Sequence, residues 1–280
     1  MMKLILLALI LLQATLATTT EITIRHYGLT RRAEIYVPAS YDPEEAMPLV
    51  IAFHPAGGSA ETMAQLTHFN EYAESEGFMV LYPQGYYGYF DYGAGYDSWA
   101  DAPDLVDDPG FMLQLVEEVQ AAYTIDQIYA VGFSNGARMA FRLGCDLPLA
   151  GIAAVAATIS DEVTTHCEAD NQPRVLFMHG TADGVIPWGG KPLYIGSQFI
   201  SNALSAPDTA AFWAAHNGCT TEINTQEAAS IRWTISYQTA GDCEGDVRFY
   251  TVENGGHQWF RDDIFDASTE IIQFFFAERS

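Results

Sequence analysis

The chain has 280 residues, of which 49% are apolar, and its formal net charge is −24 at pH 7. This apolar content is sufficient for a large core and excludes an intrinsically disordered chain. The excess of acidic groups repels nucleic acid and anionic lipid, so the composition excludes a protein that binds either partner through its surface charge.

Residues 1–17 show the order of features found in a secretory signal peptide. Lys3 is followed by an unbroken apolar run from Leu4 to Leu12, and small residues then lead to Ala17. The alternative is a membrane anchor, but the apolar run is too short to span a bilayer and no later segment reaches that length. We therefore predict cleavage after Ala17, secretion to the periplasm or the extracellular space, and no membrane attachment afterwards.

Residues 18–280 alternate short apolar runs with longer segments of helical pattern. An opening antiparallel hairpin is predicted from residues 21–26 and 33–37. Strands are predicted at Pro48–Phe53, Phe78–Leu81, Ile128–Phe133, Arg174–Met178 and Val247–Val252. Helices are predicted at about 60–76, 109–123, 135–144, 207–217 and Ser268–Ala277, with a tyrosine-rich loop at 82–99 and an irregular excursion at 185–206. This alternation predicts one α/β domain, with a mostly parallel central sheet and helices on both of its faces.

Four cysteines in an exported chain indicate two disulfide bonds. Three pairings are open, and we favour Cys145–Cys167 and Cys219–Cys243 because pairing sequence neighbours closes short loops. No two cysteines lie within a few residues of each other, so their spacing does not indicate a metal site.

The segment YAVGFSNGARMA, residues 129–140, places Ser134 between Gly132 and Gly136. A predicted buried strand precedes the serine and a predicted helix follows it, which is the context of the Gly-x-Ser-x-Gly nucleophile elbow. The two glycines let the strand and the helix approach each other, while the tight turn exposes the serine hydroxyl. The backbone N–H of Asn135, at the start of the helix, is then expected to donate to an oxyanion.

A nucleophilic serine needs a base, and in α/β-hydrolases the chain order is serine, acid, histidine. His257 lies in the glycine-flanked ENGGHQW loop after the last predicted strand, from which it can reach back over the sheet. His179 precedes the acid candidate, and His216 lies in a predicted helix, so both fit this order less well. Asp183, in HGTADGVIPW, follows a strand end on the same rim, although an ordinary turn aspartate is the alternative. We predict that Ser134, Asp183 and His257 form a catalytic triad.

A second oxyanion donor is expected in the segment VIAFHPAGGSAE, where an apolar strand leads into a glycine-bearing loop. The corresponding loop carries HGGG-type motifs in lipases and esterases. We predict that the backbone N–H of Ala56 is this donor. His54 is expected to be a structural hydrogen-bonding residue and not a base.

Six motifs together resemble the secreted polyhydroxybutyrate depolymerase and feruloyl esterase-like family of α/β-hydrolases, related to carbohydrate esterase family 1. They are HPAGGSAETM, DDPGFMLQLVEE, YAVGFSNGARMA, HGTADGVIPWGG, FWAAHNGC and ENGGHQW, spread over about residues 30–277. The resemblance implies an α/β-hydrolase fold and a serine carboxylester hydrolase that uses the triad and the oxyanion donors named above. It also implies the Cys219–Cys243 bond, because the cysteine of FWAAHNGC commonly pairs with one shortly before the final strand.

The expected reaction is cleavage of hydroxyalkanoate, feruloyl or acetyl esters through an acyl-enzyme, with no metal and no organic cofactor. The sequence lacks HExxH and paired-cysteine signatures, and the GAG at 93–95 lacks the rest of a dinucleotide fingerprint. Alternatives are an acetylxylan esterase or a peptidase on the same scaffold, and a non-catalytic binding protein.

Aromatic residues are the candidates for contact with the substrate. Trp188 and Trp259 lie next to the predicted acid and base in sequence, and Trp99 ends the tyrosine-rich loop. Aromatic walls suit a feruloyl ring, a sugar or a hydroxyalkanoate chain. The alternative is an ordinary surface loop whose rings simply pack.

Overall fold

A computed structural model of the chain describes residues 16–93, 106–165, 167, 171–195, 198–219, 223–240, 243 and 245–276. Most of the predicted signal peptide and Trp99 lie outside these residues. The strands are β1 (Thr18–His26), β2 (Leu29–Val37), β3 (Met47–Phe53), β4 (Met79–Gln84), β5 (Ile125–Phe133), β6 (Gly151–Val155), β7 (Arg174–Gly180), β8 (Lys191–Ile195), β9 (Gln198–Ala203), β10 (Ile223–Ala228), β11 (Ile235–Ala240) and β12 (Val247–Val252). The helices are α1 (Ala60–Thr67), α2 (Phe69–Glu76), α3 (Asp108–Ala122), α4 (Asn135–Asp146), α5 (Asp161–Thr164), α6 (Ala206–His216) and α7 (Ala267–Phe276).

Ten of the strands form one sheet in the order β1-β2-β4-β3-β5-β6-β7-β12-β11-β10. The strands from β4 to β12 in this order pair parallel to one another. Antiparallel partners extend the sheet at both ends, β1 and β2 beyond β4, and β11 and β10 beyond β12. The predicted mostly parallel central sheet and the predicted N-terminal hairpin are confirmed.

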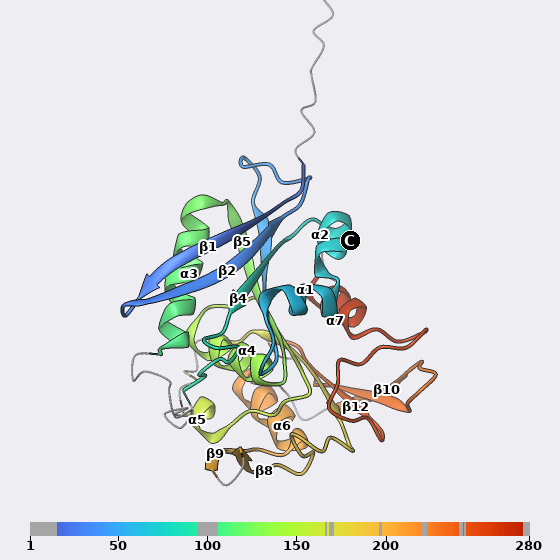
Figure 1. Cartoon of the computed structure of the whole chain (residues 1–280). Coiled ribbons are helices and arrows are strands. Elements are labelled where there is room, and N and C mark those ends of the chain that lie inside the picture. Colours follow the sequence, from blue (N-terminus) through green and yellow to red (C-terminus); the bar gives the residue numbers. More distant parts are fainter. Residues whose placement is uncertain are drawn as a thin grey trace, which may run out of the picture.

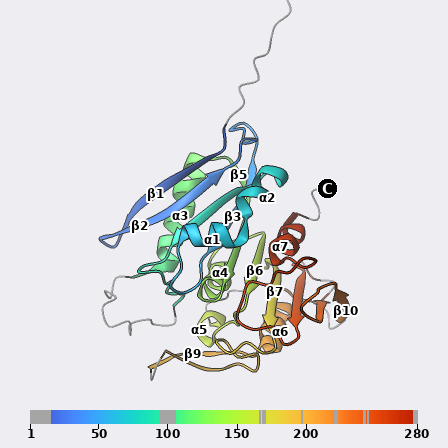
Figure 2. The same cartoon turned by 45° about the vertical axis from the view of Figure 1, so that its right-hand side comes forward.

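Helices cover both faces of this sheet, and each face has its own apolar core (Figure 1). Successive side chains of a strand point to opposite faces, so β3 contributes to both cores. Leu49, Ile51 and Phe53 join the core under α3, α4 and α6, whereas Val50 and Ala52 join the core under α1, α2 and α7. Figure 2 shows the latter three helices along one side of the sheet. Burial on both faces explains why this strand reads as a continuous apolar run.

The prediction of a single helix at about 60–76 is wrong, because the structure has the two helices α1 and α2 there. His68 adopts a left-handed conformation with φ 55°, and it ends α1 and precedes α2. Its backbone N–H still donates to the carbonyl of Ala64 at 3.0 Å, which closes the last turn of α1. The apolar pattern continues across this break, so the pattern alone does not reveal it.

Several strands have no counterpart among the predictions. The strand β6, with the sequence GIAAV, is fully buried but carries few of the β-branched and aromatic residues that mark a strand. The edge strands β10 and β11 are largely polar and are defined by their antiparallel pairing. The excursion predicted as irregular at 185–206 contains the antiparallel pair β8–β9.

The structure contains disulfide bonds between Cys145 and Cys167 and between Cys219 and Cys243, so the favoured pairing is confirmed. The first bond ties the end of α4 to the segment after α5. The second ties the end of α6 to the segment before β12. None of the helices in the described ranges has both the length and the apolar character needed to cross a bilayer.

Removing the second disulfide tests its contribution to stability. The double variant Cys219→Ser, Cys243→Ser opens a loop with a sequence separation of 24 residues, and the free energy of unfolding is expected to fall by about 3 kcal/mol. Urea unfolding of the wild type and of the variant, with Cys145–Cys167 intact in both, measures the difference. A loss below about 1 kcal/mol would contradict the assigned contribution.

Candidate active site

Ser134 lies at the junction of β5 and α4 in a strained backbone conformation. Its φ of 56° and ψ of −117° place a non-glycine residue at positive φ, an arrangement that costs about 1–3 kcal/mol. Three hydrogen bonds hold it there. Its N–H donates to the carbonyl of Val155 at 2.9 Å, and its carbonyl accepts from the N–H groups of Ala137 at 3.0 Å and Arg138 at 3.3 Å. The turn therefore has the geometry of a nucleophile elbow.

The two flanking glycines are required by close backbone contacts. A methyl group on Gly132 would overlap the backbone of Gly136, and one on Gly136 would overlap the carbonyl groups of Phe53 and His54. The start of α4 thus lies directly against the ends of β5 and β3. This contact explains the Gly-x-Ser-x-Gly spacing in physical terms.

The three residues predicted as a triad form one hydrogen-bonded chain in the structure. His257 Nε2 lies 2.8 Å from Ser134 Oγ, and His257 Nδ1 lies 2.8 Å from Asp183 Oδ2. With an ionised aspartate, the Nδ1–H donates to Asp183 and Nε2 is left to accept the serine hydroxyl proton. The serine is 8% exposed and the carboxyl group of the aspartate is buried.

The loops that carry Asp183 and His257 are bonded to each other. Their parent strands, β7 and β12, are parallel neighbours in the sheet, so both loops leave the same edge. Ala182 N–H donates to the carbonyl of Gly255 at 3.0 Å, and Asn254 N–H donates to Thr181 Oγ1 at 2.8 Å. These bonds fix the loop of Asp183 relative to the loop of His257.

Asp183 is held as a carboxylate. Burial alone would raise its pKa, but the hydrogen bond and charge of His257 and two backbone N–H groups outweigh burial and lower the pKa below its usual value. Those N–H groups belong to Val185 and Ile186, and each donates to Asp183 Oδ1 at 2.8 Å. The residue can therefore stabilise a positive charge on the imidazole.

His179 lies behind the acid and is fully buried. Its Nε2 contacts the carbonyl of Ile186 at 2.9 Å, and the same nitrogen lies 3.9 Å from Asp183 Oδ2. Burial lowers the pKa of His179 to about 4, despite the opposing charge of Asp183. It is therefore a neutral residue that packs against the acid, in accord with its weaker fit to the order serine, acid, histidine.

Two of the three tryptophans predicted as substrate contacts lie in the described part of the chain, and both pack against other aromatic rings. Trp259 is 7% exposed, its indole N–H donates to Ser268 Oγ at 3.1 Å, and its ring meets the edge of Phe133 with centroids 6.3 Å apart. Phe133 in turn stacks on His257 at 5.3 Å. Trp188 is half-buried and stacks on Phe249 at 5.5 Å. Trp259 thus packs against Phe133, which stacks on the imidazole of His257, and little of its own surface is exposed.

The loop after β3 carries the predicted second oxyanion donor. His54 is buried, with Nδ1 2.8 Å from the carbonyl of Pro55 and Nε2 accepting from Gly85 N–H at 3.0 Å. Burial lowers the pKa of His54, which agrees with its predicted structural role. The N–H groups of Gly57 and Gly58 are used within the fold. The N–H of the exposed Ala56 donates to no group within the described part of the chain.

The sequence pattern predicts a role only for the backbone of Asn135, whereas in the structure its side chain is bonded as well. The side-chain amide exchanges two hydrogen bonds with the backbone of Phe90, at 2.9 and 3.0 Å. One turn further along α4, the buried Arg138 donates to the hydroxyl of Tyr92 at 2.8 Å. The signal available in the sequence was the pair of polar side chains Asn135 and Arg138, three residues apart in a helix that packs against a sheet.

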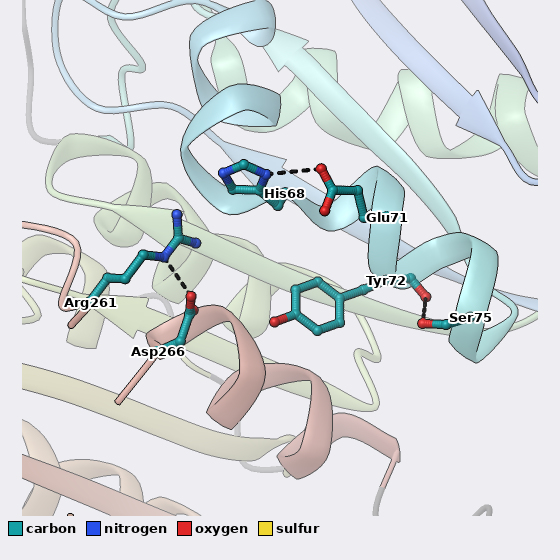
Figure 3. A pocket seen from close by; sticks show the side chains of 6 residues that line it. All are labelled: His68, Glu71, Tyr72, Ser75, Arg261 and Asp266. Carbon is teal, nitrogen blue, oxygen red and sulfur yellow. Dashed lines mark hydrogen bonds and ion pairs between the residues drawn. The ribbon is translucent and has the colours of Figure 1, made fainter. Parts of the chain in front are cut away.

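Two clefts lie apart from the triad residues. A polar cleft of about 420 Å³ is shown in Figure 3, and it is lined by His68, Glu71, Tyr72, Ser75, Arg261 and Asp266. Its polar groups contact each other, His68 Nδ1 with Glu71 Oε1 at 3.1 Å and Arg261 Nε with Asp266 Oδ2 at 2.5 Å. An apolar cleft of about 390 Å³ lies between α6 and the strands β11 and β12. Among the described residues, no group of three His, Cys, Asp or Glu side chains is placed to hold a metal ion.

A model of the family described as esterase PHB depolymerase matches residues 32–170. The protein NocK of Nocardia uniformis subsp. tsuyamanensis is 28% identical over 264 residues, which are 87% of this chain and 74% of NocK. Feruloyl esterase B of Piromyces equi is 26% identical over 237 residues, covering 81% of this chain and 42% of that enzyme. The chain thus spans less than half of the Piromyces enzyme.

Among solved structures, an acetyl xylan esterase from Aspergillus awamori aligns with a TM-score of 0.63 at 16% identity. The alignment covers 91% of this chain and 98% of that one. This likeness shows that the sheet and its helices form the α/β-hydrolase fold, as predicted from the sequence.

The close contact at the elbow predicts the effect of a single added methyl group. Gly136→Ala forces the start of α4 away from the end of β3, and the free energy of unfolding should fall by about 2 kcal/mol or more. Gly189→Ala is the matched control, because its added methyl group meets no atom within 4 Å. Chemical denaturation of both variants checks this, and equal stabilities would contradict the proposed contact.

The burial of His179 predicts a pH dependence of stability. The pKa is about 4 in the folded protein and 6.5 in the unfolded chain, so between these values the unfolded chain binds the proton more readily. Stability must therefore fall as the pH drops from about 6.5 to 4, by roughly 3 kcal/mol from this group. His179→Gln removes the titration, and its unfolding free energy should decline less steeply over that window. Parallel curves for the wild type and the variant would refute this assignment.

Proposed function

We propose that the chain, whose residues 32–170 match the model of the esterase PHB depolymerase family, hydrolyses carboxylic esters with Ser134, Asp183 and His257 as its catalytic triad. The observation that carries the proposal is the unbroken chain of two hydrogen bonds, 2.8 Å each, from the aspartate through the imidazole to the serine hydroxyl. The strained elbow beneath the serine supports the same role.

The proposed reaction proceeds through an acyl-enzyme. Ser134 Oγ attacks the ester carbonyl carbon while its proton passes to His257 Nε2, and Asp183 stabilises the imidazolium. Collapse of the tetrahedral intermediate breaks the ester bond, and the leaving alcohol takes the proton from the imidazolium. Water, deprotonated by the same histidine, then attacks the acyl group and restores the serine. The chain's own side chains supply every proton transfer, so no metal or organic cofactor is required.

The negative oxygen of the intermediate is proposed to accept from the backbone N–H groups of Asn135 and Ala56. Asn135 is the first residue of α4, where N–H groups point out of the helix and favour negative charge. Ala56 lies in the loop after β3, and β3 pairs directly with β5 up to Phe53 and Gly132. The two donors therefore start from neighbouring strands at the same edge of the sheet.

We propose feruloyl and acetyl esters of plant cell-wall polysaccharides as the substrate class. Relatives and structural neighbours named as feruloyl and acetyl xylan esterases support this choice. The aromatic segment after β4 supports it as well, because the hydroxyl of Tyr89 lies close to Gly57 in the loop that carries Ala56. Hydroxyalkanoate esters, which the family description names, are the second candidate.

We also infer that residues 18–280 form one catalytic domain that is secreted after removal of a signal peptide. One sheet draws its strands from residues 18 to 252, which supports a single domain. The two disulfides support secretion, since such bonds persist in oxidising compartments.

The test compares the wild type with Ser134→Ala on methyl ferulate, acetylated xylan and hydroxybutyrate oligomers. We expect the wild type to cleave at least one of the first two, and Ser134→Ala to lose activity by at least about 10⁴-fold. Ser236→Ala, on the strand β11, is the matched control and should retain activity. An organophosphate should label the wild type and the control but not Ser134→Ala.

Two outcomes favour the rival functions. Wild-type protein that neither reacts with the organophosphate nor cleaves p-nitrophenyl acetate would indicate a binding protein on a hydrolase scaffold. Cleavage of amide substrates at rates equal to those of matched esters would indicate a peptidase. Cleavage of hydroxybutyrate oligomers alone would replace the proposed substrate class with the second candidate.

A further inference from the structure

The segment of residues 85–92, here called the tyrosine loop, lies between the two proposed sources of oxyanion donors. It begins directly after β4 and contains a tight turn, in which Gly88 N–H donates to the carbonyl of Gly85 and Tyr89 N–H donates to that of Tyr86, both at 3.0 Å. Specific bonds join the loop to the helix α4 on one side and to the segment after β3 on the other. The loop thus connects α4 to the segment after β3, the two parts of the chain whose relative position sets the distance between the proposed donors.

On the helix side, three residues on one face of α4 hold the loop. The side-chain oxygen of Asn135 accepts from Phe90 N–H at 2.9 Å, and its side-chain nitrogen donates to the carbonyl of Phe90 at 3.0 Å. Arg138 donates to the hydroxyl of Tyr92 at 2.8 Å, and Arg142 donates to the carbonyl of Tyr92 at 3.2 Å. The spacing of these residues places them on one stripe of the helix.

On the strand side, the loop is bonded to the segment that carries Ala56. Gly57 N–H donates to the carbonyl of Gly88 at 2.8 Å, and Gly85 N–H donates to His54 Nε2 at 3.0 Å. The ring of Phe90 is fully buried and packs with its centroid 4.6 Å from that of the His54 ring. The residue clamped by Asn135 therefore also presses on the segment after β3.

An oxyanion hole built from two segments works only if both donors keep their positions to within a fraction of an ångström. The N–H of Asn135 is fixed by α4, whereas Ala56 is exposed and lies in a loop. The bonds to the tyrosine loop flank Ala56 on both sides, at His54 and at Gly57. The loop is in turn fixed to α4 by the amide of Asn135.

We propose that the side chain of Asn135 is a positioning residue, which acts through the tyrosine loop to set the separation of the Asn135 and Ala56 backbone N–H groups. This inference rests on the proposed function, because it assumes that these two groups hold the oxyanion. The proposed role is carried by the two hydrogen bonds that the side chain makes with the N–H and the carbonyl of Phe90.

Loss of the clamp should affect the transition state more than substrate binding. In Asn135→Ala the buried N–H and carbonyl of Phe90 lose their partners, so the loop shifts to find others. The ground-state carbonyl makes weak use of the donors, whereas the oxyanion depends on them. We expect kcat for p-nitrophenyl acetate to fall by about 10- to 100-fold with KM changed less than about threefold.

The matched control is Asn217→Ala. Asn217 is also buried, and its side-chain nitrogen donates to the carbonyls of Pro173 at 2.7 Å and Gly245 at 2.8 Å. These partners precede β7 and β12, at the edge of the sheet opposite to the triad. This variant should lose stability comparable to that of Asn135→Ala and keep its kcat.

A second variant loosens the same loop from the strand side. Gly88 has φ 83°, and a methyl group there would come within 3.2 Å of the carbonyl oxygen of Gly58. Gly88→Ala should therefore lower kcat in the same way. Because both changes act on one loop, the double variant with Asn135→Ala should lose little more kcat than the worse single variant, instead of the product of the two losses.

The outcomes separate this inference from the proposed function. If the wild type itself is inactive and unlabelled by an organophosphate, the proposed function fails. If the wild type is active and Ser134→Ala is inactive, but folded Asn135→Ala retains full kcat, only the positioning role is overturned. An equal loss of kcat in Asn217→Ala would also overturn it, as would multiplicative losses in the double variant. Should Asn135→Ala not fold, unchanged kcat in Gly88→Ala is the overturning result.

Discussion

The contact between the start of α4 and the ends of β3 and β5 is the constraint on which the site depends. Gly132 and Gly136 allow it, because a methyl group on either would overlap neighbouring backbone. The approach forces Ser134 to positive φ, at a cost of about 1–3 kcal/mol. The bond from its N–H to the carbonyl of Val155 on β6 helps to offset this strain. The packed sheet beneath the turn thus stabilises the strained backbone that directs the hydroxyl of Ser134 toward His257.

The parallel sheet then brings distant parts of the chain to the same edge. Ser134 follows β5, Asp183 follows β7, His257 follows β12 and Ala56 follows β3, and all four strands run in the same direction. Parallel strands end at a common edge, so residues separated by 123 positions, such as Ser134 and His257, can meet at 2.8 Å. The order of the strands in the sheet, and not their order in the sequence, decides which side chains become neighbours.

The buried elements, and the meeting of Ser134, Asp183 and His257 at one edge of the sheet, could be predicted because each leaves a local signal. The apolar run of β3 and the glycines around Ser134 are direct consequences of burial and close approach. What could not be predicted depends on tertiary contacts. The polar strand β10 exists through its pairing with β11, and the break at His68 lies inside a continuous apolar pattern. Trp259 stands next to the base in sequence, yet it packs inward, because neighbours in a loop point in different directions.

Three histidines at this edge of the sheet differ in environment, and the difference bears on which of them suits the proposed role of base. His54 and His257 follow strands of the parallel sheet, and His179 is the next-to-last residue of the strand β7. His54 has partners at both ring nitrogens, and its burial lowers the pKa. His179 is fully buried behind the acid with its Nε2 against the carbonyl of Ile186. In both, burial disfavours the cation that a general base must become. His257 is bonded to an ionised carboxylate through Nδ1 and faces Ser134 through Nε2. A charged imidazole therefore has a compensating partner at this position, and proton transfer from the serine is favoured there over the other two.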